Sequence, residues 1–522
     1  MEIKVLDGKN TIGGSKILVA NKDTAVFLDF GKNFKTWGDY FEEFLQPRVS
    51  TGIIHDLWRL GLLPHYSGVY REDLILNNFK KEVEKNPSLN ISAILLSHAH
   101  IDHCGYIPFL RENIPVYTSL ITKRLMNVMQ NTGKGGVFSQ YANIKLRKEI
   151  EDLYHNKVLK NRTEKDGNVN YSRKFNVGAE GQIGAIKYKF YPVEHSIPGA
   201  SAIYLEVDGV KIAYTGDLRF HGASKQSTYD FVESMSKIKP DILISEGTRV
   251  TKEDYTMWKD SKGDDSVLGK NKPISEEDVY NISLETVKKH PDKLIIADFG
   301  ARNIERLGVF LKIAKETNRR LATMPEDAYM LYAVSKYYED DIGSMANNVE
   351  TINLIDDDNL FFFTPKRLTT PPWLKEDSPF NKKYKSKSVN AKDIQNNPGD
   401  YILCFSFWNM VHLLDIDLEG GIYIYSSSEA YTEEQAIDIN RLLNWIDYFH
   451  LIPYGIKRGS SDPEFDKRYH SSGHASMSNI VNMIEEINPK VLIPVHTEHY
   501  EVFANVFGSN MQVIKDNQLN FG

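Results

Sequence analysis

The sequence predicts an α/β protein with a second α/β domain in the later part of the chain. Two observations lead to this prediction. Short apolar runs end repeatedly in histidine, aspartate or glutamate, which is typical of buried strands whose ends carry a site. From about residue 248, buried strands alternate with helices, which predicts a parallel sheet flanked by helices. With 522 residues, the chain is also too long for one compact core.

The composition is typical of a soluble globular protein, with 41% hydrophobic and 25% charged residues. The formal net charge of -7 excludes a polycation that coats nucleic acid by bulk charge, but it leaves local phosphate-binding patches open. The N-terminus does not resemble a signal peptide and no apolar run could span a bilayer, so we expect a cytoplasmic protein without a membrane partner. Cys104 and Cys404 cannot form a disulfide framework, which fits a reducing compartment.

Two strands are expected near the N-terminus, over residues 16–20 and 24–30. Asp29 lies at the end of the second strand. A buried carboxylate there is costly unless it supports something, such as hydrogen bonds to the histidine-rich loop described next. Capping of a turn explains Asp29 equally well at this point.

The most informative stretch is SAILLSHAHIDHCGYIP, at residues 92–108. Its apolar run predicts a buried strand, and a polar cluster begins where that strand must end. The cluster consists of His98, His100, Asp102 and His103. Imidazole nitrogens and a carboxylate oxygen are ligands that suit zinc or manganese. We interpret the stretch as metal-binding rather than as a histidine-rich surface turn, because a buried strand precedes it.

Beyond this stretch, helices are expected at residues 120–129 and 141–159. A basic run continues from the second helix, and a solvated helix face is its simplest explanation, with phosphate contact as the alternative. The residues concerned are Lys157, Lys160, Arg162 and Lys165.

Three further polar residues stand at or just past the ends of expected strands. His195 follows YKFYPVE, Asp217 ends VKIAYTGD, and Glu246 ends the apolar part of DILISEGTR. Strand ends on one edge of a sheet converge in space. We therefore expect these side chains to join the first cluster.

In the second domain, strands are expected at 293–300 and 421–430, and a helix at 433–449. Three serines, Ser426, Ser427 and Ser428, precede this helix and could bind a terminal phosphate through hydroxyls and helix amides. A helix N-cap box with Glu429 is about as good an explanation. Residues 356–400 have the least regular pattern, so we expect a loop there, and nucleic-acid contact by its lysines is a minority hypothesis. These are Lys382, Lys383, Lys385, Lys387 and Lys392.

Two more candidate site residues lie near the end of the sequence. His474 lies in a Ser-Gly-His-Ala-Ser turn before an amphipathic helix, and His496 follows the strand KVLIPV. Either histidine alone could cap a helix or pack in a core. Together with the other polar strand ends, they are interpreted as two more site residues.

The pattern of these residues resembles the metallo-β-lactamase superfamily, which carries an HxHxDH loop, a later lone histidine and a bridging aspartate. More narrowly, it resembles the β-CASP nucleases of the ribonuclease J-like group. The resemblance implies a metallo-β-lactamase αβ/βα sandwich with an inserted α/β β-CASP domain. The sandwich would be formed by residues 1–247 and 456–522, and the insert by residues 248–455.

The resemblance also implies roles. One metal would be held by His98, His100, His195 and Asp217, and a second by Asp102, His103, Asp217 and His496. Asp102 would orient the attacking water, and His474 would contact the scissile phosphate or assist the leaving oxygen. Asp29 and Glu246 would orient the ligands, while Ser426, Ser427, Ser428 and Ser472 are the candidate phosphate ligands. The two divalent ions would be zinc, with manganese as the alternative.

These implications describe a ribonuclease that acts on single-stranded RNA, 5′ to 3′ from an end and with possible internal cleavage, in RNA processing or decay. A DNA nuclease of the same superfamily and a catalytically silent RNA-binding subunit are the alternatives. Thr497 departs from the family's usual His-Gly-Glu ending. No C-terminal oligomerisation domain is expected after His496, so a homo-oligomer is possible but would not form by that route.

Overall fold

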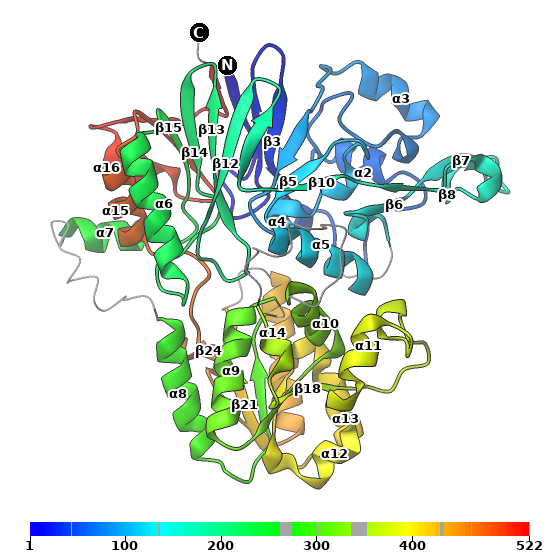
Figure 1. Cartoon of the computed structure of the whole chain (residues 1–522), viewed down its shortest axis with the longest axis vertical. Coiled ribbons are helices and arrows are strands. Elements are labelled where there is room, and N and C mark those ends of the chain that lie inside the picture. The colour runs from blue at the N-terminus through cyan, green and yellow to red at the C-terminus, as the bar shows by residue number, and fades with distance from the viewer. Residues whose placement is uncertain are drawn as a thin grey trace.

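The computed structural model describes residues 1–42, 44–133, 136–260, 274–300, 302–335, 352–428, 433–460 and 462–520. These residues form three seven-stranded sheets. Two of the sheets lie together in the upper part of the molecule, and the third lies below them (Figure 1). No helix of the described ranges is long and apolar enough to cross a bilayer.

The first sheet leads to the histidine-rich loop. Its order is β10-β5-β4-β3-β2-β1-β27. The strands are β1 (Glu2–Asp7), β2 (Lys16–Ala20), β3 (Ala25–Phe30), β4 (Ala93–Leu95), β5 (Val116–Thr118), β10 (Phe175–Val177) and β27 (Gln518–Asn520). Because β3 and β4 are parallel neighbours, Asp29 and the loop after β4 reach the same edge of the sheet.

The second sheet carries the other polar strand ends. Its order is β11-β12-β13-β14-β15-β25-β26. The strands are β11 (Glu180–Ile183), β12 (Ile186–Pro192), β13 (Ser201–Val207), β14 (Val210–Tyr214), β15 (Ile242–Glu246), β25 (Val491–Val495) and β26 (Gln512–Val513). Since β14, β15 and β25 are parallel, their carboxyl ends share one edge, where Glu246 ends β15 and where Asp217 and His496 follow β14 and β25.

The two sheets pack face to face, with helices on their outer faces, and this confirms the αβ/βα sandwich. Apolar side chains from both sheets, such as Leu28 and Ile212, fill the space between them. The first sheet is covered by α2 (Ile53–Arg59), α3 (Asn77–Glu84), α4 (Ile101–Cys104) and α5 (Leu120–Thr132). The second is covered by α6 (Lys225–Ile238), α7 (Lys252–Asp260), α15 (Met477–Ile487) and α16 (Tyr500–Phe507). A short helix, α1 (Phe34–Gly38), follows β3.

The third sheet is entirely parallel, as expected from the alternation of strands and helices. Its order is β19-β18-β17-β20-β16-β21-β22. The strands are β16 (Ile295–Asp298), β17 (Arg320–Thr323), β18 (Leu360–Phe363), β19 (Ser388–Val389), β20 (Tyr401–Cys404), β21 (Gly421–Tyr425) and β22 (Leu451–Tyr454). Its helices are α8 (Glu276–Lys288), α9 (Ile304–Glu316), α10 (Pro325–Val334), α11 (Pro379–Tyr384), α12 (Ala391–Asn396), α13 (Leu413–Ile416) and α14 (Glu433–Tyr448). The exact domain boundaries, after residues 247 and 455, stay a prediction.

The helix expected at residues 141–159 is wrong. The segment instead forms β6 (Asn143–Lys145), β7 (Arg147–Glu151) and β8 (Lys157–Asn161), and β6 pairs with the later β9 (Asn170–Ser172). The β7–β8 hairpin projects from the upper part of the molecule (Figure 1). Asp152 accounts for the difference, because its carboxylate accepts the backbone N–H groups of Tyr154 and Asn156 and so closes a turn where a helix would continue.

The loop expected at residues 356–400 is also wrong, because α11, β19 and α12 lie within it. Three of its lysines have partners inside the protein. Lys387 Nζ donates to the carbonyl oxygens of Ile355 and Asp357, Lys385 pairs with Glu376, and Lys383 lies near Asp356. Only Lys387 is held by backbone carbonyl oxygens, whereas the pairs of Lys383 and Lys385 are at the surface, so nucleic-acid contact by these lysines stays a minority hypothesis.

A buried cluster of charges joins the sandwich to the third sheet. Arg219, which is fully buried, bonds Glu194 of the sandwich, Glu276 at the start of α8 and Glu305 of α9. Its Nη1 also donates to the carbonyl oxygen of Ser472, at 3.0 Å. One guanidinium therefore connects four chain segments.

We expect Arg219→Gln to lower the free energy of unfolding by about 3–5 kcal/mol, because it leaves buried carboxylates without their counter-charge. Urea unfolding followed by tryptophan fluorescence measures the change. Arg458→Gln is the matched control, since Arg458 pairs with Asp447 on the exposed surface. Equal midpoints for the two variants would contradict this account of the junction.

Candidate metal centre

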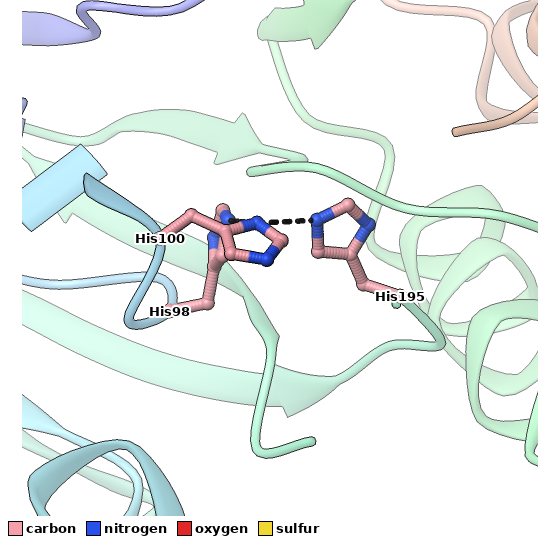
Figure 2. A group of neighbouring side chains, drawn as sticks. All are labelled: His98, His100 and His195. Atoms are coloured by element: carbon pink, nitrogen blue, oxygen red, sulfur yellow. Dashed lines mark hydrogen bonds between the residues drawn. The ribbon is translucent and has the colours of Figure 1, made fainter. Parts of the chain in front are cut away.

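Three histidines from two different loops meet at the edge of the sandwich. His98 and His100 follow β4, and His195 follows β12. Figure 2 shows their rings turned toward one another. His100 Nδ1 lies 3.1 Å from His98 Nε2 and 3.0 Å from His195 Nε2. Tetrahedral zinc with bonds of roughly 2.0–2.1 Å places its nitrogen ligands roughly 3.3 Å apart, so this spacing suits one ion.

A second group of ligand atoms lies beside the first. It consists of Asp102, His103, Asp217 and His496. His496 Nε2 lies 3.1 Å from Asp102 Oδ2, and His103 Nε2 lies 3.1 Å from Asp217 Oδ2. The same oxygen of Asp217 is 3.8 Å from His98 Nε2 and 3.9 Å from His195 Nε2. Asp217 therefore stands between the two groups, as a bridging ligand would.

Two buried atoms of this centre lack a hydrogen-bond partner among the described residues: His103 Nε2 and Asp217 Oδ1. His103 Nε2 is close to Asp217 Oδ2, but the pair does not have hydrogen-bond geometry. Leaving such atoms unpaired is costly, and a bound cation would satisfy both. The residues present thus fit a metal centre.

The protonation of the site also suits metal binding. Burial lowers the pKa of His98 and His195 well below the usual value and that of His100 to about 4, so these imidazoles are neutral and free to ligate. Burial acts in the same direction on His103, but the nearby Asp217 and Asp102 carboxylates raise its pKa well above normal. A cation in the second group would take the place of that proton.

The histidine-rich loop is held against the ends of β2 and β3 by close backbone contact. The carbonyl oxygen of Asp102 accepts the N–H groups of Gly14 and Ser15, and that of Ile101 accepts the N–H of Lys32. At Gly31, a Cβ atom would lie 1.6 Å from the Asp102 carbonyl oxygen. Only glycine allows this approach.

Asp29 lies beside the centre and bonds the histidine-rich loop. Its fully buried carboxylate accepts from four donors: Ser97 N, Ser97 Oγ, His103 Nδ1 and Tyr214 OH, each at 2.7 Å. The bond to His103 fixes the ring so that Nε2 faces Asp217. Its backbone has a φ of 56°, a left-handed conformation that aspartate tolerates.

We expect Asp29→Ala to weaken metal binding roughly 10- to 100-fold, because it frees the His103 ring. The same change should destabilise the fold by about 3 kcal/mol, since four buried donors lose their acceptor. Competition with a chelating dye measures the affinity, and thermal unfolding of the chelated protein measures stability. Unchanged affinity in a folded variant would show that Asp29 has no part in orienting His103.

Glu246 holds a second set of contacts behind the centre. Its carboxylate accepts from Leu218 N at 2.8 Å and Thr248 Oγ1 at 2.7 Å, and His474 Nδ1 lies 3.1 Å away. Thr248 Oγ1 is also 2.8 Å from His496 Nδ1. Glu246 therefore orients His474 directly and His496 through Thr248.

His474 lies at the rim, with its side chain 21% exposed. Its Nδ1 lies 3.1 Å from Glu246 and 3.9 Å from Asp217. Burial opposes ionisation, but the Glu246 and Asp217 carboxylates raise the pKa of His474 to about 9. Ser472 shapes the turn, since its Oγ accepts the N–H of His474 and its carbonyl oxygen accepts from Arg219 and His221.

The candidate phosphate-binding serines differ in how available their hydroxyl groups are. Ser426 is buried, and its Oγ accepts from Arg306 and donates its one proton to the carbonyl oxygen of Tyr469, so it has no proton left to donate to a phosphate. Ser427 and Ser428 are partly exposed and stay candidates. Glu429, the partner in the alternative N-cap box, lies outside the described residues.

Sequence reasoning missed several supporting residues: Ser97, Tyr214, Thr248 and Arg219. Ser97 and Thr248 stand next to or near predicted site residues, and this proximity was the available signal. Tyr214 and Arg219 lie close to Asp217 in the chain, but their partners Asp29 and Glu305 are distant.

Two family models match the chain. Residues 75–245 match the metallo-beta-lactamase superfamily, and residues 467–507 match the Zn-dependent metallo-hydrolase RNA specificity domain. The matched segments lie on either side of the third sheet in the chain. They include every candidate ligand named above.

Similar proteins include the RNase J-like protein of Methanocaldococcus jannaschii, 34% identical over 26% of this chain and 28% of that protein. Ribonuclease J of Mycoplasma genitalium is 22% identical over 81% of this chain and 60% of that protein. The chain thus spans less than two thirds of these relatives. A crystal structure of a protein of unknown function from Enterococcus faecalis V583 has a TM-score of 0.66, 20% identity and 99% coverage of both chains, which supports the fold.

Proposed function

We propose that the chain is a metal-dependent ribonuclease acting on single-stranded RNA, because its segments match the metallo-beta-lactamase superfamily and the Zn-dependent metallo-hydrolase RNA specificity domain and because it is similar to ribonuclease J. The observation that carries this proposal is the pair of ligand groups around Asp217, with buried atoms that lack a partner among the described residues. Such a centre requires a cation and lies next to a histidine suited to acid catalysis.

Two divalent ions, zinc or manganese, would occupy the centre. His98, His100, His195 and Asp217 would hold one, and Asp102, His103, Asp217 and His496 the other. When bound, the ions would activate a water for attack and stabilise the charge of the phosphodiester.

Asp102 and His474 would act on the reacting groups. Asp102 Oδ2 is near His496 and would accept a hydrogen bond from the attacking water. His474 Nδ1 is engaged by Glu246, which leaves Nε2 to donate a proton to the departing oxygen. Glu246 thereby keeps the ring in the orientation that this transfer needs.

The third sheet and its helices would roof the centre and select an unpaired strand by shape. Contact of α9 with Arg219 and Ala223 beside the centre supports this arrangement. We propose 5′ to 3′ degradation from an end, with internal cleavage possible, in RNA processing or decay. A cytoplasmic location stays a prediction, and a homo-oligomer stays an open possibility.

A DNA nuclease is the second candidate, because the ligands select a phosphodiester and not a sugar. A silent RNA-binding subunit is the third. It is disfavoured because every ligand position is filled and the ligand atoms converge.

The decisive experiment is a time course with a 5′-monophosphorylated single-stranded RNA that carries a 3′ label, in manganese or zinc. The control is the His100→Ala, Asp102→Ala double variant. Stepwise shortening of the labelled strand by the wild type alone supports 5′ to 3′ exonuclease action at this centre, whereas discrete fragments indicate internal cleavage. A DNA strand of the same sequence tests whether cleavage depends on ribose or also occurs with deoxyribose. No RNA cleavage by metal-loaded protein would reject the proposal.

A further inference from the structure

Two arginines beside the centre have no binding partner within the described chain. Arg249 and Arg302 form no side-chain hydrogen bond or ion pair with any residue that the structure describes. Every other arginine of the chain forms at least one. Both side chains are partly buried, so water only partly compensates their charge. Their position therefore needs an explanation other than fold stability.

Arg302 approaches the centre from the third sheet. It lies between β16 and α9, and Asn303 caps α9 by accepting the N–H of Arg306 at 3.0 Å. Glu305, in the first turn of α9, bonds Arg219 and the backbone N–H of Ala223 in the sandwich. The start of this helix thus faces the segment that follows Asp217.

Arg249 approaches from the sandwich itself. It follows Thr248, which contacts both Glu246 and His496. Burial chiefly lowers the pKa of His221 and His470 to about 4, and the charge of Arg249 contributes to both shifts. His221 bonds the carbonyl oxygen of Ser472, so Arg249 lies near the turn that carries His474.

We propose that Arg249 and Arg302 bind backbone phosphates of the single-stranded substrate on either side of the phosphodiester at the metal centre. The substrate class in this inference rests on the proposed function. A strand that crosses the centre would pass both the start of α9, next to Arg302, and the segment after Glu246, which carries Arg249. A guanidinium donates two parallel hydrogen bonds to a phosphate, and it stays charged at any physiological pH.

An unpaired arginine has a physical cost that supports this assignment. A partly buried guanidinium without a carboxylate loses hydration and gains no ion pair in the free protein. Binding of a phosphate would recover that loss, so the two arginines favour the bound state rather than the folded state. Arg219 and Arg306, which are fully buried nearby, show how this chain pairs an arginine that serves stability.

The test measures binding of a fluorescein-labelled 12-nucleotide RNA to the full-length, metal-loaded chain in a His474→Ala background, where turnover is expected to be lost. Arg249→Gln and Arg302→Gln should each weaken binding about tenfold. Each should also reduce the slope of log affinity against log salt by about 0.7, the value for one phosphate contact on a single strand. A merely structural role would not change this slope.

Three controls complete the test. Arg458→Gln changes the net charge equally at an exposed site, and should leave affinity and slope as they are. Arg302→Lys should restore the salt slope but only part of the RNA affinity, because lysine keeps the positive charge but cannot donate the two parallel hydrogen bonds of a guanidinium. Zinc content per chain is measured for every variant, and a loss of zinc in either glutamine variant would show a role in the centre and overturn the proposal.

Cleavage separates this inference from the proposed function. With otherwise wild-type protein, kcat/KM should fall about tenfold more on RNA than on bis(p-nitrophenyl) phosphate, which has no flanking phosphates. Equal losses on both substrates, or unchanged affinity and slope for RNA, would overturn the proposal. If the wild type cleaves neither substrate, the proposed function fails, while the binding slopes still decide the role of the arginines.

Discussion

Replacement of Asp217 by asparagine is expected to abolish metal binding and to lower turnover by about a thousandfold or more. Asp217 Oδ2 lies within 3.9 Å of ring nitrogens of His98, His103, His195 and His496. No other carboxylate of the described chain is placed between the two ligand groups. An amide keeps the shape of the side chain but removes the charge that draws two cations together.

Metal analysis of the purified variant, followed by the RNA time course, measures this effect. Asp415→Asn is the matched control, because Asp415 forms an exposed pair with Lys366 far along the chain from the centre. Full metal content together with near-normal turnover in Asp217→Asn would show that Asp217 does not bridge the ions and that the two groups do not act as one centre.

Replacement of His474 by alanine is expected to leave the metal content intact and to lower kcat by about 100- to 10,000-fold, the usual effect of a general acid. Its Nδ1 is engaged by Glu246, so the ring has one nitrogen left for the substrate. The alternative is that His474 is itself a ligand, because its ring nitrogen also groups with His195 and Asp217.

Metal content and kcat measured on the same preparation distinguish these roles. A substrate with an activated leaving group, such as a p-nitrophenyl phosphodiester, needs no proton at the departing oxygen. His474→Ala should therefore retain more of its activity on this substrate than on RNA. Loss of metal from His474→Ala would instead assign the residue to the ligands and leave the acid unidentified.

The candidate ligands could be predicted from the sequence because local signals mark them. His98, His100, Asp102 and His103 lie within six residues, directly after an apolar strand. His195, Asp217 and His496 likewise follow strands, and the carboxyl ends of parallel strands share one edge. The parallel third sheet was predictable for a similar reason, since strand and helix periodicities alternate.

The two wrong expectations have different causes. Residues 141–159 contain enough charged and apolar residues at helical spacing to predict a helix, but the side chain of Asp152 closes a turn there. In 356–400, short helices and a two-residue strand are stabilised by contacts with distant segments, such as Lys387 with Ile355. Periodicity does not report such contacts.

The sequence by itself determined the α/β class, the metal-binding residue types and their places at the ends of strands, because these depend on neighbours within a few residues. Only the tertiary structure decided which partner each supporting side chain has. Asp29 is hydrogen-bonded to Tyr214, Glu246 is hydrogen-bonded to His474, and Arg219 forms an ion pair with Glu305, in each case across a long stretch of chain. It also decided that Arg249 and Arg302 have no such partner among the residues that the structure describes, because a pairing between distant segments exists only once the sheets have packed.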